Sequence, residues 1–232
     1  MRRELAVRWS FTSREGGVSE PPFAFDNLAA HVGDDPTAVD RNRARLAHAL
    51  GVPRLVTMRP NHANAVAIVG ANDEEIHDVD AIVTTEANVG LLAQGADCSP
   101  IVVADESAGV IAAVHCGWRG VVAGIVPATL AVFTQLGATA QWALVGPTIC
   151  ATCYPVGADV ADEFAAVGGV VRTAANGQPS VDVRASVARQ FADHGVQVNH
   201  HGGCTFEDVT LFSYRRDGVT GRQGAAIARV SL

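Results

Sequence analysis

Between residues 80 and 116 the chain carries four short apolar segments in close succession, at 80–85, 89–94, 100–105 and 109–116. Each is bounded by Gly, Pro or acidic residues, which favour turns. Segments of this length are typical of buried strands and are short for helices. Consecutive strands satisfy their backbone hydrogen bonds by pairing, so the middle of the chain predicts a β-sheet core.

The flanking segments mix further strands with helices. Strands are expected at 5–12, 64–70, 142–145, 196–200 and 224–231, and an acidic surface loop at 72–78. Helices are expected from Asp35-Pro36 to Gly51, from Gly120 to Gly137 with a kink at Pro127, at 157–167 and at 184–194. Because helices and strands mix without strict alternation, the pattern favours one α/β or α+β domain over residues 1–232.

Charge and composition exclude several classes of partner. The 17 basic residues are outnumbered by 24 acidic ones and are mostly scattered, so we expect no binding to nucleic acid. No apolar stretch is long enough for a transmembrane helix, and we expect no membrane association. The five cysteines are an odd number, and the N-terminus does not resemble a secretory signal. Free thiols or metal ligands in a cytoplasmic protein are therefore expected.

Two strands predict a metal site at one sheet edge. Cys98 precedes the strand at 100–105, and His115 ends the strand at 109–116. If these strands pair as a hairpin, Cys98 and His115 face each other, and His62 could join them. A thiolate and two imidazoles are good zinc ligands, and three protein ligands leave a fourth position open, as in catalytic sites. Each residue taken alone is better explained as an ordinary buried side chain.

The sequence contains several motifs in an order that covers nearly the whole chain. They are Ser13-Arg14-x-Gly16-Gly17-Val18-Ser19, Asn27-Leu28, Asn42-Arg43, Asp97-Cys98-x-Pro100, Ala113-Val114-His115-x-Gly117-Trp118-Arg119-Gly120, Gly146-Pro147-x-Ile149 with Cys153-Tyr154, and Phe212-Ser213-Tyr214-Arg215-Arg216. Together they resemble the YfiH-like family. Its members were long described as multicopper polyphenol oxidase or laccase-domain proteins, and are now regarded as purine nucleoside phosphorylases.

This resemblance implies both a fold and an activity. The fold is α+β, a single domain of mixed β-sheets sandwiched by helices in four α/β/β/α layers. The implied activity is zinc-dependent phosphorolysis of adenosine, inosine, guanosine and methylthioadenosine, with adenosine deaminase as a side activity. The implied substrates are purine nucleosides and phosphate, and copper is the alternative metal. The chain departs from the family at Pro60-Asn61, Cys116 and Pro155. We interpret Cys116 as a small apolar filler.

The expected site residues follow from the same motifs. His62, Cys98 and His115 match the metal ligands of the family, and Asp97 is added as a catalytic residue that supports a ligand or substrate, or caps a turn. The expected substrate-binding residues are Asn27, Arg43, Arg119, Tyr154 and Arg215. Arg43 lies on the apolar face of the first helix, so we expect it to point toward the active site and hold phosphate or ribose.

Other interpretations stay open. A copper polyphenol oxidase would use the same Cys and His residues, but eight dispersed histidines cannot build a multicopper cluster. A cysteine hydrolase would use Cys98 as nucleophile and His115 as base, and a non-catalytic binding protein is a further alternative. Cys150-x-x-Cys153 could be half a zinc site or a redox pair, with His200, His201 or Cys204 as partners, although no second such motif exists.

Overall fold

The computed structural model describes residues 5–231, and residues 1–4 and 232 of the predicted domain lie outside them. Helices and strands interleave along the chain. In order they are β1 (Leu5–Phe11), η1 (Ala30–Val32), α1 (Pro36–Leu50), β2 (Leu55–Arg59), β3 (Val66–Ile68), β4 (Glu75–His77), β5 (Ala81–Thr84), β6 (Gly90–Gly95), β7 (Ser99–Asp105), β8 (Val110–Cys116), α2 (Trp118–Ala123), α3 (Ile125–Gln135), β9 (Trp142–Val145), η2 (Ala151–Cys153), α4 (Ala158–Ala166), β10 (Val170–Thr173), β11 (Pro179–Asp182), α5 (Val183–Ala192), β12 (Gln197–His200), α6 (Tyr214–Asp217) and β13 (Gln223–Ser231).

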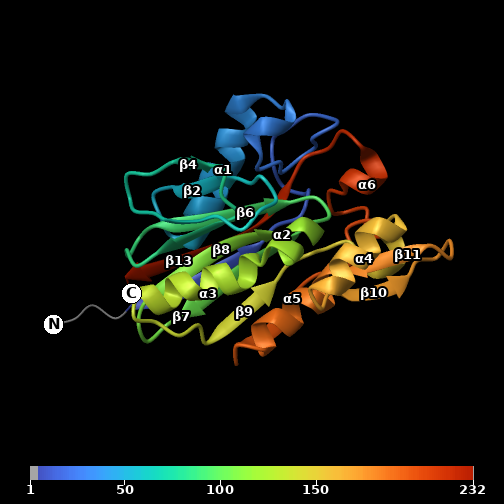
Figure 1. Cartoon of the computed structure of the whole chain (residues 1–232). Helices are drawn as coiled ribbons and strands as arrows, with labels where there is room; N and C mark the ends of the chain where they lie inside the picture. Colours follow the sequence, from blue (N-terminus) through green and yellow to red (C-terminus); the bar gives the residue numbers. More distant parts are fainter. Residues whose placement is uncertain (1–4, 232) are drawn as a thin grey trace.

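Two mixed sheets stack face to face at the centre of the molecule (Figure 1). One has the strand order β1-β13-β6-β2-β4 and the other β12-β9-β7-β8-β5-β3. Their inner faces enclose an apolar cluster that includes Leu91 and Ile227 from the first sheet and Val102 and Ile111 from the second. Each of these four side chains is fully buried. Burial of both inner faces is the main apolar contribution that holds the sheets together.

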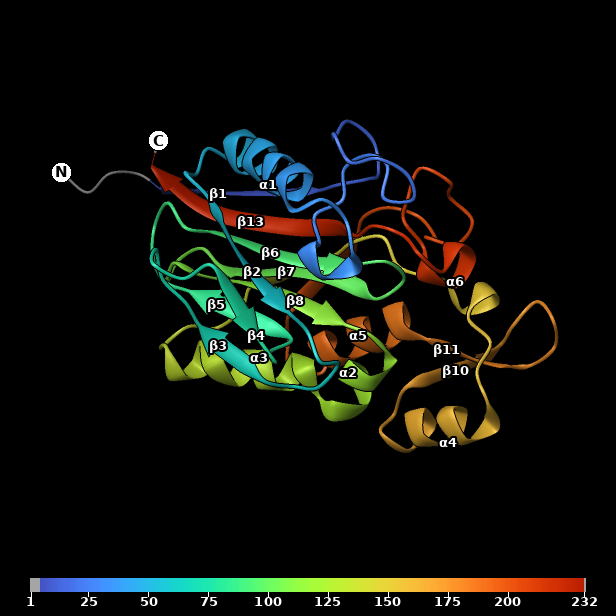
Figure 2. The ribbon, with the colours of Figure 1, turned by 90° about the horizontal axis from the view of Figure 1, so that it is seen from above.

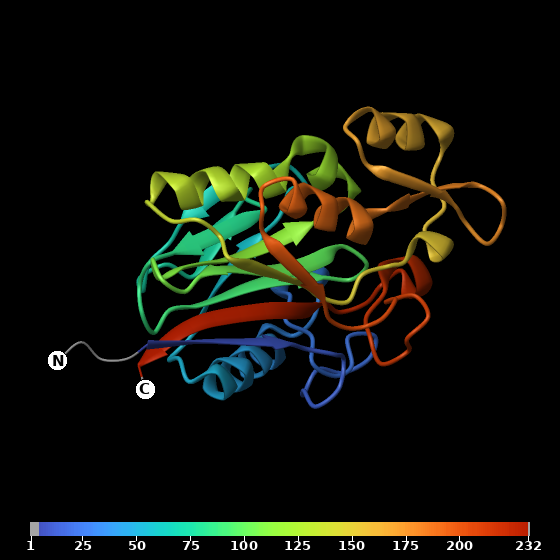
Figure 3. The same ribbon diagram turned by 90° about the horizontal axis from the view of Figure 1, so that it is seen from below.

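Helices cover the two outer faces, on opposite sides of the molecule (Figure 3). Leu46 and Leu50 of α1 pack on Leu92 and Ala226 of the first sheet. Side chains of α2, α3 and α5, among them Phe133, pack on the second sheet. The α+β arrangement of mixed sheets between helices, in four layers, is therefore confirmed. A lobe of α4, β10 and β11 projects to one side (Figure 2).

The hairpin that the sequence predicts is present. β7 and β8 pair antiparallel, and the register sets Ser99 opposite Cys116 and Pro100 opposite His115. Gly109 closes the turn in a left-handed conformation, with φ of 72°. This register brings the start of β7 beside the end of β8, where Cys98 and His115 lie. The remaining predicted strands and helices agree within a few residues, with the exceptions that follow.

The prediction of one helix from Gly120 to Gly137 is wrong in where the helix starts and in where it is interrupted. It begins at Trp118, and it divides into α2 and α3 at Gly124 rather than bending at Pro127. Gly124 has φ of 80° and donates its N–H to the carbonyls of Gly120 and Val121, which ends α2. Pro127 lies in the first turn of α3, where a missing N–H breaks no helical hydrogen bond. The left-handed Gly124, and not Pro127, therefore changes the direction of the chain between the two helices.

The acidic loop expected at 72–78 is also wrong in part, because β4 lies within it. β4 pairs parallel with β2 at the edge of the first sheet. An edge strand tolerates charged side chains, which keep its exposed backbone from pairing with other strands. Its composition therefore resembles that of a loop. The sequence pattern predicts no strand at the positions of β2, β10 and β11.

Asn42 of α1 ties down the long loop between β1 and α1. Its amide donates to the Ser19 hydroxyl and to the carbonyl of Asn27, and its carbonyl accepts the N–H of Val18. Asn42 is 1% exposed, so water cannot replace these bonds. This loop also carries His31, which reaches the site described below.

Replacing Asn42 by Ala should therefore lower the free energy of unfolding by about 3 kcal/mol, because buried groups lose their partners. Urea unfolding measures this. Arg41→Ala, an exposed position one residue away on α1, is the control and should change stability by less than about 0.5 kcal/mol. Equal stability of the two variants would contradict the assigned role of Asn42.

Candidate metal centre

His62, Cys98 and His115 converge at one end of the hairpin. Their potential ligand atoms all lie within 4.8 Å of one another. Cys98 directly precedes β7, His115 lies near the end of β8, and His62 lies on the loop between β2 and β3. The rings of His62 and His115 stand nearly perpendicular, with centroids 4.8 Å apart. The spatial grouping expected from the sequence is thus present, and its size suits a single metal ion.

Local backbone geometry makes room for this grouping. Gly117 follows β8, and a Cβ atom there would lie 2.7 Å from the Cys98 Sγ and 3.4 Å from the His62 Cδ2. A side chain at this position would therefore displace the Cys98 sulfur and lie in contact with the His62 ring. His62 itself has φ of 64°, a left-handed conformation that few non-glycine residues adopt. Such backbone outliers concentrate at functional sites.

Asp80, which the sequence analysis missed, supports two of the ligands. Its carboxylate is fully buried. Oδ1 lies 2.8 Å from the His115 Nδ1 and accepts the backbone N–H of His62, and Oδ2 accepts the N–H of Ala63. When Nδ1 of His115 donates to this carboxylate, Nε2 is left to bind a metal. The only sequence signal for Asp80 is its place just before an apolar strand.

The same contacts shift the pKa values of two ligands in the metal-free site. Burial raises the pKa of the Cys98 thiol, but the adjacent His115 and His62 outweigh it and lower that pKa to about 6. Burial lowers the pKa of His115, but Cys98 and Asp80 outweigh it and raise that pKa to about 9. At neutral pH Cys98 is therefore largely a thiolate, which is the form that binds metals.

The three ligands lie in a cavity of about 550 Å³. Cationic and aromatic side chains share its wall. It is lined by His31, Pro60, His62, Gln94, Gly95, Ala96, Asp97, Cys98, His115, Trp118, Arg119, Tyr154, Tyr214, Arg215 and Arg222. The volume lies within the range of small-molecule sites. The guanidinium of Arg215 lies over the Tyr154 ring at 4.8 Å, and that of Arg119 over the Trp118 ring at 4.5 Å.

Three expected substrate-binding residues, Arg119, Tyr154 and Arg215, line this cavity, whereas Asn27 and Arg43 do not. Asn27 is fully buried and hydrogen-bonded to the loop around it. The expectation that Arg43 points toward the active site is wrong. Its guanidinium donates to the Leu28 carbonyl and pairs with Glu75 at 3.4 Å, so the charge on the apolar face has a structural partner.

Asp97 lies at the cavity wall but its oxygens are already engaged. Oδ1 accepts the hydroxyls of Thr205 and Ser213, and Oδ2 accepts the N–H of Arg215. Asp97 also has φ of 94°. Its carboxylate therefore fastens the connection between β12 and the start of α6, at several points, to the ligand-bearing loop, and it accepts no hydrogen bond from a metal ligand in these contacts.

Several cavity residues were not predicted as site residues, among them His31, Gln94, Tyr214 and Arg222. Gln94 donates to the Leu28 carbonyl, while its Oε1 is buried and meets no donor within the described part of the chain. A buried acceptor without a partner is costly, so Gln94 offers a hydrogen-bond site for a ligand. Cys116 packs in the apolar core, and burial raises the pKa of its thiol well above the usual value, which agrees with its interpretation as a filler.

Comparisons with known proteins give the same relatives from sequence and from structure. A family model described as "Multi-copper polyphenol oxidoreductase laccase" matches residues 8–230. A purine nucleoside phosphorylase of Mycobacterium tuberculosis is 45% identical over 94% of this chain and 90% of its own. Another, of Corynebacterium glutamicum, is 41% identical over 97% of this chain and 95% of its own.

Solved structures share the fold over nearly the full length. YlmD from Geobacillus stearothermophilus has a TM-score of 0.89 and 32% identity, covering 97% of this chain and 92% of that chain. The hypothetical protein YfiH of Bacillus licheniformis has a TM-score of 0.87 and 26% identity, covering 96% and 92%. Within residues 5–231 no helix has the length and apolarity needed to cross a bilayer.

Replacing Cys98 by Ala should remove one equivalent of bound metal per chain, because two histidines without the thiolate hold zinc weakly. Elemental analysis of the purified protein measures this loss. Cys116→Ala removes a neighbouring thiol that is not a proposed ligand, and it should keep the full metal content. Retention of all metal by the Cys98→Ala variant would refute this ligand set.

In the metal-free protein, alkylation of Cys98 by iodoacetamide should be half-maximal near pH 6, the lowered pKa, rather than near the ordinary thiol value of about 8.5. The rate should fall below that pH, where the thiol is protonated, and level off above it. Peptide mass spectrometry identifies the modified residue. His115→Gln removes the neighbouring cation and should move the midpoint upward. A midpoint at the ordinary thiol value in the unsubstituted protein would exclude a stabilised thiolate.

Proposed function

We propose that this chain, which belongs to the family described as multi-copper polyphenol oxidoreductase laccase, is a purine nucleoside phosphorylase that uses one zinc ion. The observation that carries the proposal is the shared cavity: an open set of metal ligands and a group of arginines line the same space. The relatives named purine nucleoside phosphorylase support the same reaction. The proposed substrates are purine nucleosides, namely adenosine, inosine, guanosine and methylthioadenosine, and phosphate.

The residues fit zinc better than a multicopper centre. His62, Cys98 and His115 offer one thiolate and two imidazoles, with a carboxylate behind one imidazole, which is a common arrangement around zinc. Within residues 5–231 only two groups could hold a metal, and only this one contains histidine. A multicopper cluster needs many imidazoles close together. A zinc ion bound here would supply a Lewis acid with an open coordination position.

The proposed reaction exchanges one bond for another at the sugar. The bond from C1′ to the purine nitrogen breaks, and the base leaves with the electron pair. A phosphate oxygen forms the new bond to C1′, and the proton of hydrogen phosphate passes to the base. The products are the free purine and ribose 1-phosphate. No reactant beyond nucleoside and phosphate is needed.

Cavity residues supply the binding that such a reaction requires. The guanidiniums of Arg119, Arg215 and Arg222 can neutralise phosphate and hold it in line with C1′. Tyr154 and Tyr214 offer ring faces for a purine. The unpaired Oε1 of Gln94 can accept a hydrogen bond from an amino group or ring N–H of the base.

Two finer features belong to the same proposal. Slower conversion of adenosine to inosine would use the same ligand set, because an open zinc position can also activate water. We also propose that the protein works in the cytoplasm. All five cysteines are free thiols, which fits a reducing compartment.

Adenosine with phosphate should therefore yield adenine and ribose 1-phosphate, and His115→Ala should lower both this activity and deamination by at least about 100-fold, since both depend on one metal site. Liquid chromatography of reactions with and without phosphate measures both products. Arg41→Ala, remote from the cavity, serves as the control and should retain full activity.

Three outcomes would count against the proposal. Adenine release that does not depend on phosphate would indicate hydrolysis. Turnover by metal-free protein that iodoacetamide on Cys98 abolishes would favour the cysteine hydrolase. Oxidation of phenols after copper loading, without nucleoside turnover, would favour the oxidase.

A further inference from the structure

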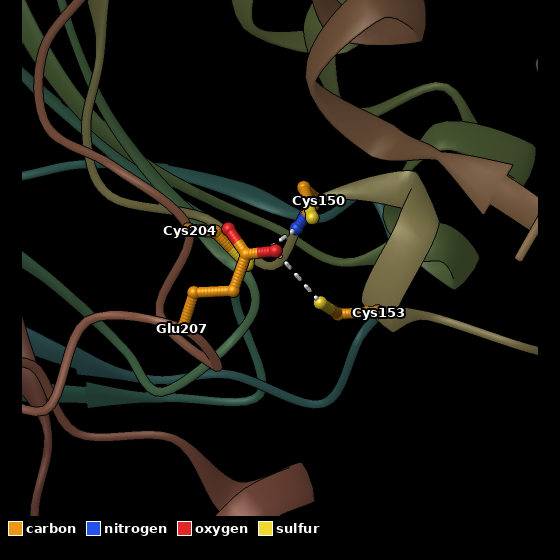
Figure 4. A group of neighbouring side chains, drawn as sticks. All are labelled: Cys150, Cys153, Cys204 and Glu207. Atoms are coloured by element: carbon orange, nitrogen blue, oxygen red, sulfur yellow. Dashed lines mark hydrogen bonds between the residues drawn. The ribbon is translucent and has the colours of Figure 1, made fainter. Parts of the chain in front are cut away.

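A second group of metal-binding side chains lies apart from the site described above. Cys150, Cys153, Cys204 and Glu207 face one another across two loops, one after β9 and one after β12 (Figure 4). Their potential ligand atoms all lie within 4.8 Å of one another. The sequence suggested His200, His201 and Cys204 as partners of the Cys150-x-x-Cys153 pair. Cys204 lies in the group, Glu207 takes the fourth place, and His201 stacks on Phe11.

The spacing of this group is compatible with a closed zinc site. Four ligands around zinc, at about 2.3 Å for sulfur, stand roughly 3.8 Å apart in a tetrahedron. Each loop contributes a pair separated by two residues, Cys150 with Cys153 and Cys204 with Glu207. Such short spacings are typical of structural zinc sites, because one turn then presents two ligands on the same side. The short helix η2 forms that turn between Cys150 and Cys153.

Backbone amides are already directed at one of the sulfurs. The N–H of Cys150 donates to the Sγ of Cys204 at 3.2 Å, which joins the two loops. Burial raises the pKa of the Cys204 thiol, but hydrogen bonds from Cys150, Glu207 and Phe206 outweigh it and hold that pKa below its usual value, whereas burial and the neighbouring thiols raise the pKa of Cys150 and of Cys153 in the absence of metal. Hydrogen bonds of this kind orient and stabilise metal-bound thiolates.

We propose that Cys150, Cys153, Cys204 and Glu207 form a second, structural zinc site. Four protein ligands leave no open position, so this site does no chemistry. Its effect is to fasten together two loops that both reach the first cavity. Tyr154, next to Cys153, lines that cavity, and Thr205, next to Cys204, donates its hydroxyl to Asp97 at 2.6 Å. This inference does not depend on the proposed enzymatic activity.

Metal content tests the second site directly. Protein saturated with Zn²⁺ and freed of excess metal should contain about two zinc ions per chain. The Cys98→Ala, Cys150→Ser and Cys204→Ser variants should each contain about one, and the Cys98→Ala/Cys204→Ser double variant none. Cys116→Ala controls for loss of a thiol outside both groups and should keep two. One zinc ion in the unsubstituted protein, unchanged by Cys150→Ser or Cys204→Ser, would overturn the proposal.

Two further measurements keep the proposal testable if a cysteine variant fails to fold. Glu207 is exposed, so Glu207→Gln should fold, and it should weaken one of the two zinc sites at least about tenfold in competition with a chelator. Cobalt titration of the unsubstituted protein should show tetrahedral thiolate absorption that keeps growing through the second equivalent. Equal chelator resistance in Glu207→Gln would count against Glu207 as a ligand. A mass 2 Da lower in freshly purified protein, with a disulfide mapped to these cysteines, would identify a redox pair instead.

Discussion

One buried carboxylate holds together the first group of potential metal ligands, His62, Cys98 and His115. Asp80 has no exposure to solvent, yet its two oxygens meet the backbone of the loop that carries His62 and the ring of His115. An unpaired charge at such depth would be very costly, so these donors are required and not incidental. Because the donors come from two separate segments, the carboxylate aligns two ligands at once. Cys98 is then brought to them by strand pairing alone.

The part of the site that follows from strand register could be predicted from the sequence. Apolar runs on either side of a short turn predict a hairpin, and the positions of Cys98 and His115 at its ends follow from pairing. Asp80 and Glu207 could not be found in this way, because one acidic residue at a strand or loop end resembles any other. The resemblance to a family supported the same ligand set and added the layered architecture. It could not reveal that Cys150, Cys153, Cys204 and Glu207 lie together, because among them only Cys153 belongs to the motifs quoted for the resemblance and the family's ligand set does not include it.

The errors have physical reasons too. Pro127 was expected to bend a helix, but its place in a first turn makes it harmless, and Gly124 supplies the left-handed residue that actually ends α2. Arg43 was expected in the active site because a charge on an apolar helix face needs a partner. Arg43 does have such a partner, but it is Glu75 from an edge strand that the sequence did not reveal. The first case was decided by a local helix end at Gly124, and the second by a tertiary contact that no local pattern contains.

The position of β13 has a consequence for how the chain folds during synthesis. This strand, which begins at Gln223, lies between β1 and β6 in the first sheet and pairs with both. Leu5 pairs with Ser231, so β1, the first described strand, gains its partner only after β13, the last described strand, has been synthesised. Until β13 leaves the ribosome, β1 and β6 present unpaired edges that can pair with other chains. The first sheet is thus completed late, by a strand that lies in its interior, and its neighbours stay open to pairing with other chains until that strand is in place.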